Sequence, residues 1–297
     1  MALDVEEQPT VSGTAGIKNG NPMFRRHSSS APSVAPRPAV PRPYDGSGIT
    51  QVPSDAGPIW LDSADGVMLP YIKTFKTWEP EEGVFLKRLL HPGDVFVDVG
   101  ANVGYFVRFV SKFCEPSAIH AFEPHPTSVR LLELNSWDLE SPVTVWPMAL
   151  GGEKGTVVVS TAVNNVGDTR VSTAASDVSA TAVAVIAPMD SVLSGRVDVV
   201  KIDVQGYESD VIRGMARVWA ENPTIKLVIE FWPAAIRERG LSPEAVLAQY
   251  RAAGFTVKLL QGAAPINMDT AEIMRFCETA GPDGQVNLFL SRTAPAN

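Results

Sequence analysis

Residues 95–106, VFVDVGANVGYF, form the stretch that decides the fold. Its first five residues are a short and nearly continuous apolar run, which is typical of a strand covered on both faces. The run leads straight into a turn that contains Gly100 and Gly104. Glycine has no Cβ, so it lets the backbone turn sharply and lets a ligand come close to the main chain. In open parallel sheets ligands bind beyond the carboxyl ends of the strands, so we predict a ligand site at this turn.

Strand and helix patterns alternate from about residue 58 onward. Repeated strand–helix–strand units predict an α/β fold with a mostly parallel sheet that helices cover on both faces. The last two strand patterns, 255–260 and 286–291, have no clear helix pattern between them, which predicts an antiparallel hairpin at one sheet edge. Residues 66–75, GVMLPYIKTF, are expected to form a strand or hairpin, and residues 208–220 one helix.

Residues 161–188 do not fit this alternation. They consist mainly of Ala, Val, Ser and Thr in a loose alternating order. Such a segment is an extra hairpin, a mobile loop over the ligand site or a plain surface insertion. The sequence leaves these three interpretations open.

Residues 1–57 differ in composition from the rest of the chain. They are rich in Pro, Ser, Gly and Ala, as in HSSSAPSVAPRPAVPRP, and show no apolar periodicity. Proline interrupts helices and central strands, and a segment of this kind buries too little apolar surface to offset the conformational entropy lost on folding. We therefore expect a disordered leader over 1–57, either a solvated tail or a docking arm, and a folded domain over 58–297.

The overall composition limits the class of protein. The chain has 297 residues and a formal net charge of -8 at pH 7, which disfavours nucleic acid as the main partner because phosphate binding needs a basic face. Cys114 and Cys277 have no C-x-x-C partner, so neither a zinc site nor a disulfide framework is predicted. No apolar run has the length of a signal-peptide core or a membrane span, so we expect a cytoplasmic protein whose oligomeric state is open.

The spacing at the glycine turn narrows the kind of ligand. G-x-x-x-G differs from the G-x-G-x-x-G of dinucleotide sites, and no G-x-x-x-x-G-K-[ST] phosphate loop follows. The turn begins with Asp98, whose carboxylate would repel a pyrophosphate but not a cationic ligand such as S-adenosylmethionine. Glu123 ends the next strand, 19 positions after Gly104, where a carboxylate can accept hydrogen bonds from both hydroxyls of a ribose. This order of features favours a positively charged adenosine derivative.

Several motifs in a fixed order carry a family resemblance: VFVDVGANVGYF, AFEPHP, LLELN, MALGG, VVKIDVQGYESDVIRGM and VIEFWP. With these motifs the chain resembles the FkbM family of S-adenosylmethionine-dependent O-methyltransferases over about residues 65–292. The resemblance implies a Rossmann-like class I methyltransferase fold, with a seven-stranded, mostly parallel sheet and an antiparallel edge hairpin. The cofactor-binding residues that it implies are Asp98, Gly100, Asn102, Gly104, Glu123, Met148 and Ala149.

Two positions of the resemblance need separate mention. Asn135, in LELN, matches a family position without a defined role. Gln205 departs from the family, which more often has an acid there, in the pattern K-I-D-V-E-G-x-E. A neutral amide is neither a base nor a strong metal ligand, so any mechanism that needs an acid at this position is in doubt for this chain.

Three acids lie where the resemblance places the methyl acceptor. Asp203 ends one strand pattern, Glu208 opens the helix that follows, and Glu230 ends the next strand pattern. An alcohol is a poor nucleophile, so a base or a metal must help to remove its proton. We predict that Asp203 is the base or positions the acceptor. Glu230 serves the acceptor, the base role or only the network around Asp203, and Glu208 either joins them or caps its helix. Mg²⁺ is possible there but not favoured, because Gln205 supplies no charged oxygen.

The leading hypothesis is therefore methyl transfer from S-adenosylmethionine to a hydroxyl of a small molecule, such as a sugar, a glycolipid head group or a polyketide. A nicotinamide-dependent oxidoreductase would have the same type of sheet, but the G-x-x-x-G spacing and Asp98 count against it. A nucleoside-binding module of the same fold that has lost catalysis is the other alternative. Fold alone does not identify the acceptor, because the loops that select it follow no transferable code.

Overall fold

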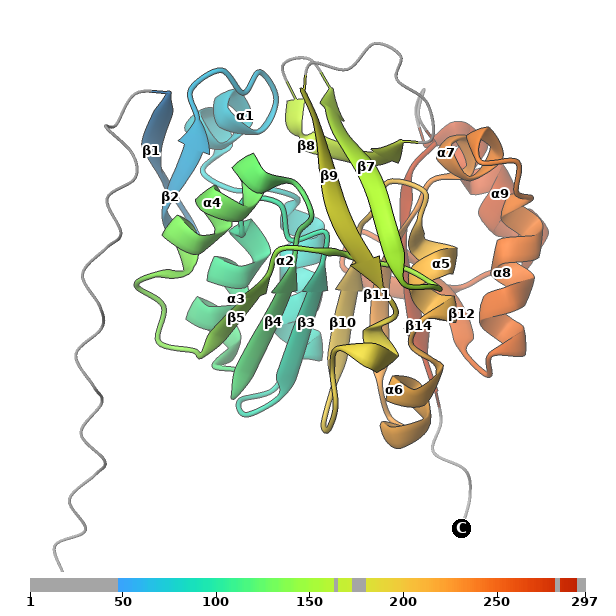
Figure 1. The fold of residues 1–297 in the computed structure, drawn as a ribbon. Coiled ribbons are helices and arrows are strands. Elements are labelled where there is room, and N and C mark those ends of the chain that lie inside the picture. The colour runs from blue at the N-terminus through green and yellow to red at the C-terminus, as the bar shows by residue number, and fades with distance from the viewer. Residues whose placement is uncertain (1–47, 163–164, 173–179, 281–283, 293–297) are drawn as a thin grey trace, which may run out of the picture. The chain divides into compact units, whose positions relative to one another are not determined.

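The computed structural model describes residues 48–162, 165–172, 180–280 and 284–292 (Figure 1). Its largest sheet has eight strands in the order β13-β12-β14-β11-β10-β3-β4-β5. The strands of this sheet are β3 (Val95–Val99), β4 (Ala118–Phe122), β5 (Val143–Trp146), β10 (Val199–Ile202), β11 (Lys226–Phe231), β12 (Thr256–Gln261), β13 (Ala264–Asn267) and β14 (Val286–Ser291). The helices of the described residues are α1 (Met68–Phe75), α2 (Pro80–Leu89), α3 (Tyr105–Cys114), α4 (Pro126–Ser136), η1 (Met189–Ser191), α5 (Glu208–Arg213), α6 (Ala216–Glu221), α7 (Pro233–Glu238), α8 (Pro243–Ala252) and α9 (Thr270–Thr279). None of the helices within these ranges is both long enough and apolar enough to cross a membrane.

The middle of the large sheet is parallel. β3 pairs in parallel with β4 and with β10, and β10 pairs in parallel with β11. From β3, the next strands in the chain, β4 and β5, are added on one side, whereas β10 and β11 are added on the other side of β3. The strand order therefore reverses between β3 and β10. Val99 lies beside Ile202 in register, and the residues that follow both strands meet at one edge. The predicted α/β fold is confirmed, and this reversal is where ligands bind in such sheets.

The antiparallel part of the sheet lies at its other side. β14 lies between β11 and β12 and is antiparallel to both, as predicted for the last two strand patterns. The short strand β13 pairs with β12 and raises the strand count from the expected seven to eight. The expectation that no helix separates these strands is wrong, because α9 lies between β13 and β14. Its start is fixed by a capping box in which Asp269 and Glu272 each accept a backbone N–H.

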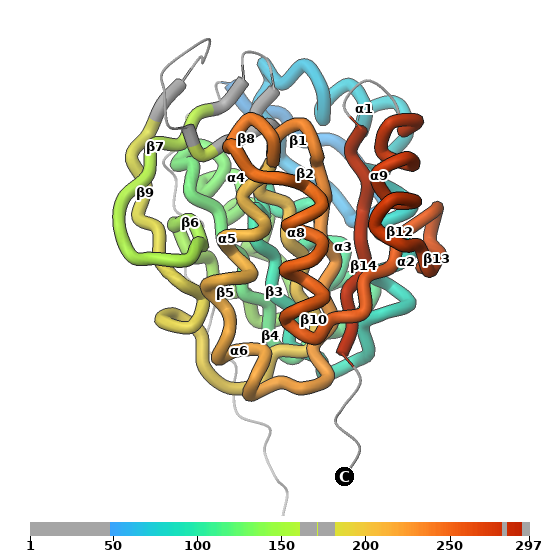
Figure 2. The backbone as a smooth tube through the Cα atoms, turned by 90° about the vertical axis from the view of Figure 1, so that its right-hand side faces the viewer, coloured from blue at the N-terminus to red at the C-terminus, as the bar shows by residue number. Residues whose placement is uncertain are grey.

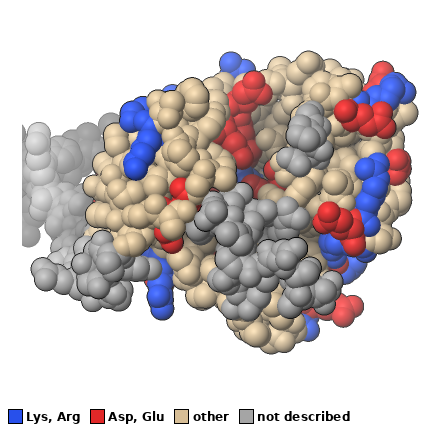
Figure 3. Space-filling model, turned by 90° about the horizontal axis from the view of Figure 1, so that it is seen from above, with Lys and Arg blue, Asp and Glu red and all other residues tan. Residues whose placement is uncertain are grey.

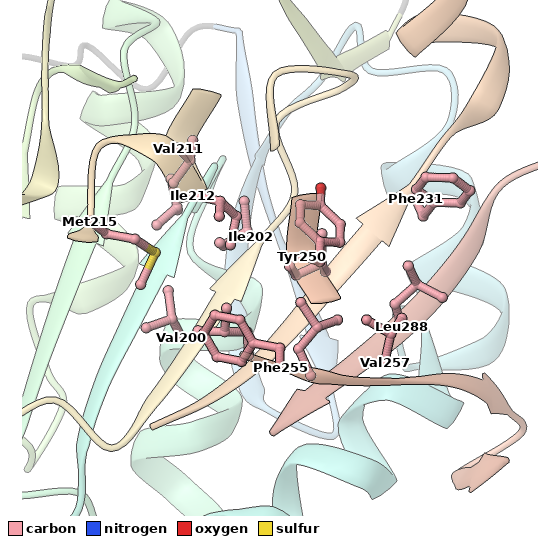
Figure 4. Close-up of a cluster of buried hydrophobic side chains, with 14 of the residues drawn as sticks. Val200, Ile202, Val211, Ile212, Met215, Phe231, Tyr250, Phe255, Val257 and Leu288 are labelled. Carbon is pink, nitrogen blue, oxygen red and sulfur yellow. The ribbon is translucent and has the colours of Figure 1, made fainter. Parts of the chain in front are cut away.

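A hydrophobic core fills each face of the large sheet. Successive residues of a strand point to opposite faces, so Val199 of β10 packs with α2, α3 and α4, whereas Val200 and Ile202 pack with α5, α6 and α8. Figure 4 shows the second core, where Tyr250 of α8 lies among side chains from β10, α5 and β11. Complete burial of a Val, Leu, Ile, Phe or Met side chain contributes about 1.5–3 kcal/mol to the free energy of folding. The two cores hold the strand ends at the reversal point in fixed positions.

The folded part begins earlier than residue 58. β1 (Ile49–Ser54) pairs antiparallel with β2 (Gly57–Asp62), and Val52 and Ile59 are buried. The expected leader boundary is therefore wrong for residues 48–57, because alternating apolar residues in this hairpin pack against the helices of one core. The rest of the predicted leader lies outside the described residues.

Two helix assignments also differ from expectation. Residues 66–75 contain the helix α1 and no strand, because Met68, Leu69 and Ile72 recur at helical spacing and are buried. Pro70 is compatible with this helix since it lies in the first turn. The single helix expected over 208–220 is two helices, α5 and α6, which are separated at Gly214.

Residues 149–187 supply a second sheet, in the order β6-β9-β7-β8. Its strands are β6 (Ala149–Leu150), β7 (Gly155–Ala162), β8 (Asn165–Ser172) and β9 (Ala180–Ala187). The alternation noted over 161–188 thus belongs to strands, which agrees with the extra-hairpin interpretation for β7 and β8. Residues 163–164 and 173–179 of that segment lie outside the described residues. Figures 1 and 2 show β7 and β9 running beside each other along one side of the molecule.

The break between α5 and α6 generates a test of the packing. A Cβ added at Gly214 would lie 2.0 Å from the carbonyl oxygen of Gly151, so Gly214→Ala must displace backbone. We expect it to lower the free energy of unfolding by about 1–3 kcal/mol in urea denaturation. Gly155→Ala is the matched control, because its Cβ would come no closer than 3.9 Å to another residue, and it should change stability by less than about 0.5 kcal/mol. Equal stability of both variants would contradict this packing.

Candidate functional site

A cavity of about 420 Å³ opens at the carboxyl ends of β3, β4, β10 and β11. Figure 3 looks down on this end, where acidic side chains lie around a hollow between two mainly uncharged regions. The second sheet contributes to the wall through Val159 of β7 and Val171 of β8. A volume of this size falls within the range of sites that enclose a small organic ligand. The predicted ligand site at the strand reversal therefore coincides with a cavity.

The glycine turn forms the floor of the cavity, and its glycines are needed for packing. Gly100 has φ +84°, and a Cβ there would lie 1.8 Å from the carbonyl oxygen of Asp203. At Gly104, with φ +86°, a Cβ would lie 2.7 Å from Leu132. Because Gly100 has no side chain, the backbone just after β10 can pack against it. The sequence alone had indicated that this space is for a ligand. Of the turn, Gly100 and Asn102 line the cavity.

Glu123 lies in the cavity wall at the end of β4, as predicted. Its Oε2 accepts a hydrogen bond of 2.9 Å from the backbone N–H of Asn102, and its Oε1 accepts one of 2.8 Å from that of His125. Burial raises the pKa of Glu123 to about 7. Each carboxylate oxygen keeps further lone pairs, so the fixed carboxylate can still accept hydroxyl donors from a ligand.

Asp98 has a different place from the one predicted. It lies within β3, is 1% exposed and does not line the cavity. Neither carboxylate oxygen has a hydrogen-bond partner among the described residues. Burial raises its pKa to about 6, although Lys201, its neighbour in register on β10, opposes the shift. Asp98 is thus a buried acid beneath the glycine turn.

An apolar wall follows β5. Met148 and Ala149, both predicted, line the cavity together with Phe122. The ring of Trp146 stacks on Phe122 with centroids 5.6 Å apart and an angle of 6° between the planes. Trp146 supports Phe122 from behind and does not itself line the cavity. Apolar cavity surface suits an aromatic ligand group such as a purine.

The opposite wall holds a connected set of polar side chains. Lys201 Nζ lies 3.1 Å from Oδ2 of Asp203, and Nε2 of Gln205 donates to Oδ1 of Asp203 at 2.9 Å and to Oε2 of Glu230 at 2.8 Å. Asp203, Gln205 and Glu230 all line the cavity. The structure therefore brings two of the three predicted acids together. The amide of Gln205 donates a hydrogen bond to each of them, where an acid would add a third carboxyl group.

The two acids differ in their electrostatics. Burial by itself would raise the pKa of Asp203, but Lys201 and the hydrogen bond from Gln205 outweigh it and hold this pKa below the usual range. Burial, followed by the charge of Asp203, raises the pKa of Glu230 well above its usual value. Asp203 is consequently a fixed anion and a strong hydrogen-bond acceptor, but a weak base.

Glu208 lies apart from these two acids. It is 1% exposed and does not line the cavity. Its Oε1 accepts hydrogen bonds from the backbone N–H groups of Gly206, at 2.9 Å, and Val204, at 3.3 Å. These contacts stabilise the turn before α5, so the role of Glu208 is structural, although it does not cap its own helix as the sequence alternative expected. Within the described residues, no group of three or more His, Cys, Asp or Glu side chains is arranged to hold a metal ion.

Sequence reasoning missed Glu79 and left Asn135 without a role. Glu79 lines the cavity from the start of α2, beside Trp78. No motif in the sequence marks Glu79. Asn135 is fully buried, and its side-chain amide bonds both the N–H and C=O of Trp60 and the C=O of Val103. It joins β2 to the glycine turn, so its role is structural.

Comparisons with known proteins identify a family domain in this chain. Residues 98–281 match the Methyltransferase FkbM domain. The 31-O-demethyl-FK506 methyltransferase FkbM of Streptomyces tacrolimicus is 45% identical over 47 residues, which make up 16% of this chain and 18% of that protein. The chain thus matches less than two thirds of the length of this relative.

Two solved structures also match the chain. A methyltransferase FkbM from Methylobacillus flagellatus has 14% sequence identity and a TM-score of 0.43, with 78% of this chain and 55% of that chain covered. A SAM-dependent O-methyltransferase from Thermotoga maritima has 13% identity and a TM-score of 0.43, with 84% and 79% covered.

The amide between the two acids generates a pH-dependent test. Gln205→Glu would place a third carboxyl beside Asp203 and Glu230, so the pKa of the new group is raised in the folded protein. The folded state then binds protons more strongly than the unfolded state, and the loss of stability grows as the pH rises above about 4.3. We expect a loss of about 1–3 kcal/mol at pH 8, measured by thermal or urea unfolding, and much less at pH 5. Gln51→Glu, at an exposed position of β1, should show no such trend, and a pH-independent effect of Gln205→Glu would contradict the arrangement.

Proposed function

Because the chain belongs to the FkbM methyltransferase family, we propose that it transfers a methyl group from S-adenosylmethionine to a hydroxyl group of a small molecule. The acceptor classes that we propose are sugars, glycolipid head groups and polyketides. The observation that carries this proposal is a single cavity with two chemically different walls. One wall combines Glu123 with apolar surface from Met148 and Ala149, and the other presents Asp203 and Glu230.

The first wall fits the methyl donor. Glu123 is held by two backbone N–H groups and retains lone pairs for the ribose hydroxyls. The buried Oδ1 of Asn102 has no hydrogen-bond partner among the described residues and can accept one from the ligand. Met148 and Ala149 would flank the adenine. S-adenosylmethionine supplies an electrophilic methyl group on a positively charged sulfur, which an acidic cavity attracts.

The second wall fits a hydroxyl acceptor. Asp203 keeps its charge through Lys201 and can accept a hydrogen bond from the acceptor hydroxyl, which orients the oxygen for in-line attack. Glu230 is held in place by Gln205 and lines the cavity, where it can contact a second hydroxyl. The name of the Streptomyces relative gives an oxygen as its methylation position, which supports an O-directed reaction for this chain.

The donor half of the proposal is tested by binding. Glu123→Ala removes the carboxylate proposed to accept the ribose hydroxyls, and each lost hydrogen bond to a charged group is worth about 1.5–3 kcal/mol. We expect the affinity for S-adenosylmethionine, measured by isothermal titration calorimetry, to fall at least about 10-fold. Glu153→Ala, at an exposed position outside the cavity, should bind like the wild type. No detectable binding of S-adenosylmethionine or its demethylated product to the wild type would refute the proposed function.

The acceptor half is tested by turnover. Labelled S-adenosylmethionine is incubated with panels of sugar, glycolipid and polyketide hydroxyls, with and without EDTA, and product formation is measured. Asp203→Asn should reduce turnover of any acceptor found by about 10²-fold or more, because the amide loses the charge that orients the hydroxyl. Its affinity for S-adenosylmethionine should stay within a few-fold of the wild type. Full activity of this variant would contradict the role given to Asp203.

A further inference from the structure

Glu79 brings a carboxyl group to the cavity from a part of the chain that precedes the matched segment 98–281. It is the residue before α2 and has left-handed backbone angles, φ 42° and ψ 62°. Such angles are uncommon for a residue other than glycine and cost about 1 kcal/mol or more. They let the chain turn into α2 while Glu79 and its neighbour Trp78 both line the cavity.

The side chain of Glu79 is hydrogen-bonded to that of Glu82, one turn further along the chain. Two carboxyl groups can form such a bond only if one of them carries a proton. Burial, followed by the charge of Glu82, raises the pKa of Glu79 to about 8, and burial raises that of Glu82 to about 7. The pair therefore shares one proton near neutral pH.

The other carboxyl groups of the cavity are engaged by donors. Glu123 accepts two backbone N–H groups. Asp203 accepts from Lys201 and Gln205, and Glu230 accepts from Gln205. Asp203 is also bonded to Glu230. Glu79 differs from these three because no N–H group among the described residues donates a hydrogen bond to its side chain, which is bonded to Glu82.

Glu82 connects the pair to a second cavity. This cavity has a volume of about 380 Å³, and it shares Glu230 and Gln285 with the first one as lining residues. Glu82 lines it, and its Oε2 accepts a hydrogen bond of 3.1 Å from Asn287. The second cavity reaches the surface at the exposed residue Glu81. Glu79 and Glu82 therefore connect the proposed reaction site with the second cavity, from which protons can reach solvent.

We propose that Glu79 is the catalytic base of the methyl transfer and that Glu82, bonded to it, shares the proton. This inference rests on the proposed function. The acceptor O–H bond breaks and its proton goes to Glu79, an O–CH₃ bond forms, and the S–CH₃ bond breaks with its electron pair remaining on sulfur. No further reactant is needed.

The charges of the site support this assignment. Binding of a cationic donor lowers the pKa of the neighbouring carboxyl pair, so the pair releases its shared proton and becomes able to accept another. During the transfer the positive charge on sulfur disappears while a proton arrives at the pair. The net charge of the buried site is thus the same before and after the reaction, which avoids the large cost of creating an uncompensated charge away from water.

Calorimetry with S-adenosylmethionine tests this inference without an acceptor. Titrations near pH 7.5 in two buffers of different ionisation enthalpy give the number of protons released on binding. We expect the wild type to release more protons than Glu79→Gln, by about one proton per donor bound, with the affinity changed only a few-fold. The control Glu133→Gln, at an exposed position of α4, should behave as the wild type. Equal proton release by Glu79→Gln and the wild type overturns the inference.

Turnover of an acceptor found with the labelled donor gives a second measurement. Glu79→Gln should lower kcat by about 10²–10⁴-fold, and Glu79→Asp should restore part of the activity. A wild type that fails to bind S-adenosylmethionine contradicts the proposed function. A wild type that binds and methylates, beside a Glu79→Gln variant with undiminished kcat, contradicts only the role of Glu79.

Discussion

The acidic end of this sheet depends on the attraction between the buried ammonium group of Lys201 and the carboxyl groups around it. Burial by itself would lower its pKa, but the carboxyls of Asp203, Glu82, Asp98 and Glu79 together raise it well above the ordinary value. Removing one partner from a buried ion pair typically costs about 3–5 kcal/mol, because an uncompensated charge is left behind. Lys201 thus allows several acids to converge in a low-dielectric site. The carboxyl groups outnumber the single positive charge of Lys201. The site therefore favours cationic ligands, and some of its carboxyl groups keep their protons.

Residues 48–97 are part of the same folded unit as the matched domain. The hydroxyl of Tyr105, at the start of α3, donates a hydrogen bond of 2.5 Å to Asp55 in the β1–β2 turn, and Asn135 bonds the backbone of Trp60 in β2. These contacts fix the hairpin to the helices that follow the glycine turn. They also explain how Glu79 can reach the cavity although it precedes the family domain in sequence.

Local sequence features were sufficient for most of the large sheet. Mainly apolar runs such as 95–99 and 199–202, each interrupted by one charged residue, identified the buried parallel strands because burial on both faces removes the polar alternation. The same reasoning failed for α1, where Pro70 obscured a helical pattern, and for α9, whose apolar positions are few and whose start depends on capping. It also failed at 48–57, where the apolar residues of a short hairpin are too few to stand out beside a proline-rich segment.

The sequence by itself determined the α/β class, the strand reversal with its glycine turn, and the placement of Glu123, Met148, Ala149, Asp203 and Glu230 around one cavity. These follow from residues at strand ends, since the carboxyl ends of parallel strands share one edge. Only the tertiary structure decided that Gly100 accommodates the carbonyl of Asp203, that Gln205 bridges two acids, and that Glu79 joins them. Such contacts link residues far apart in the chain, and whether an acid is fixed, protonated or buried depends on neighbours that local pattern does not specify.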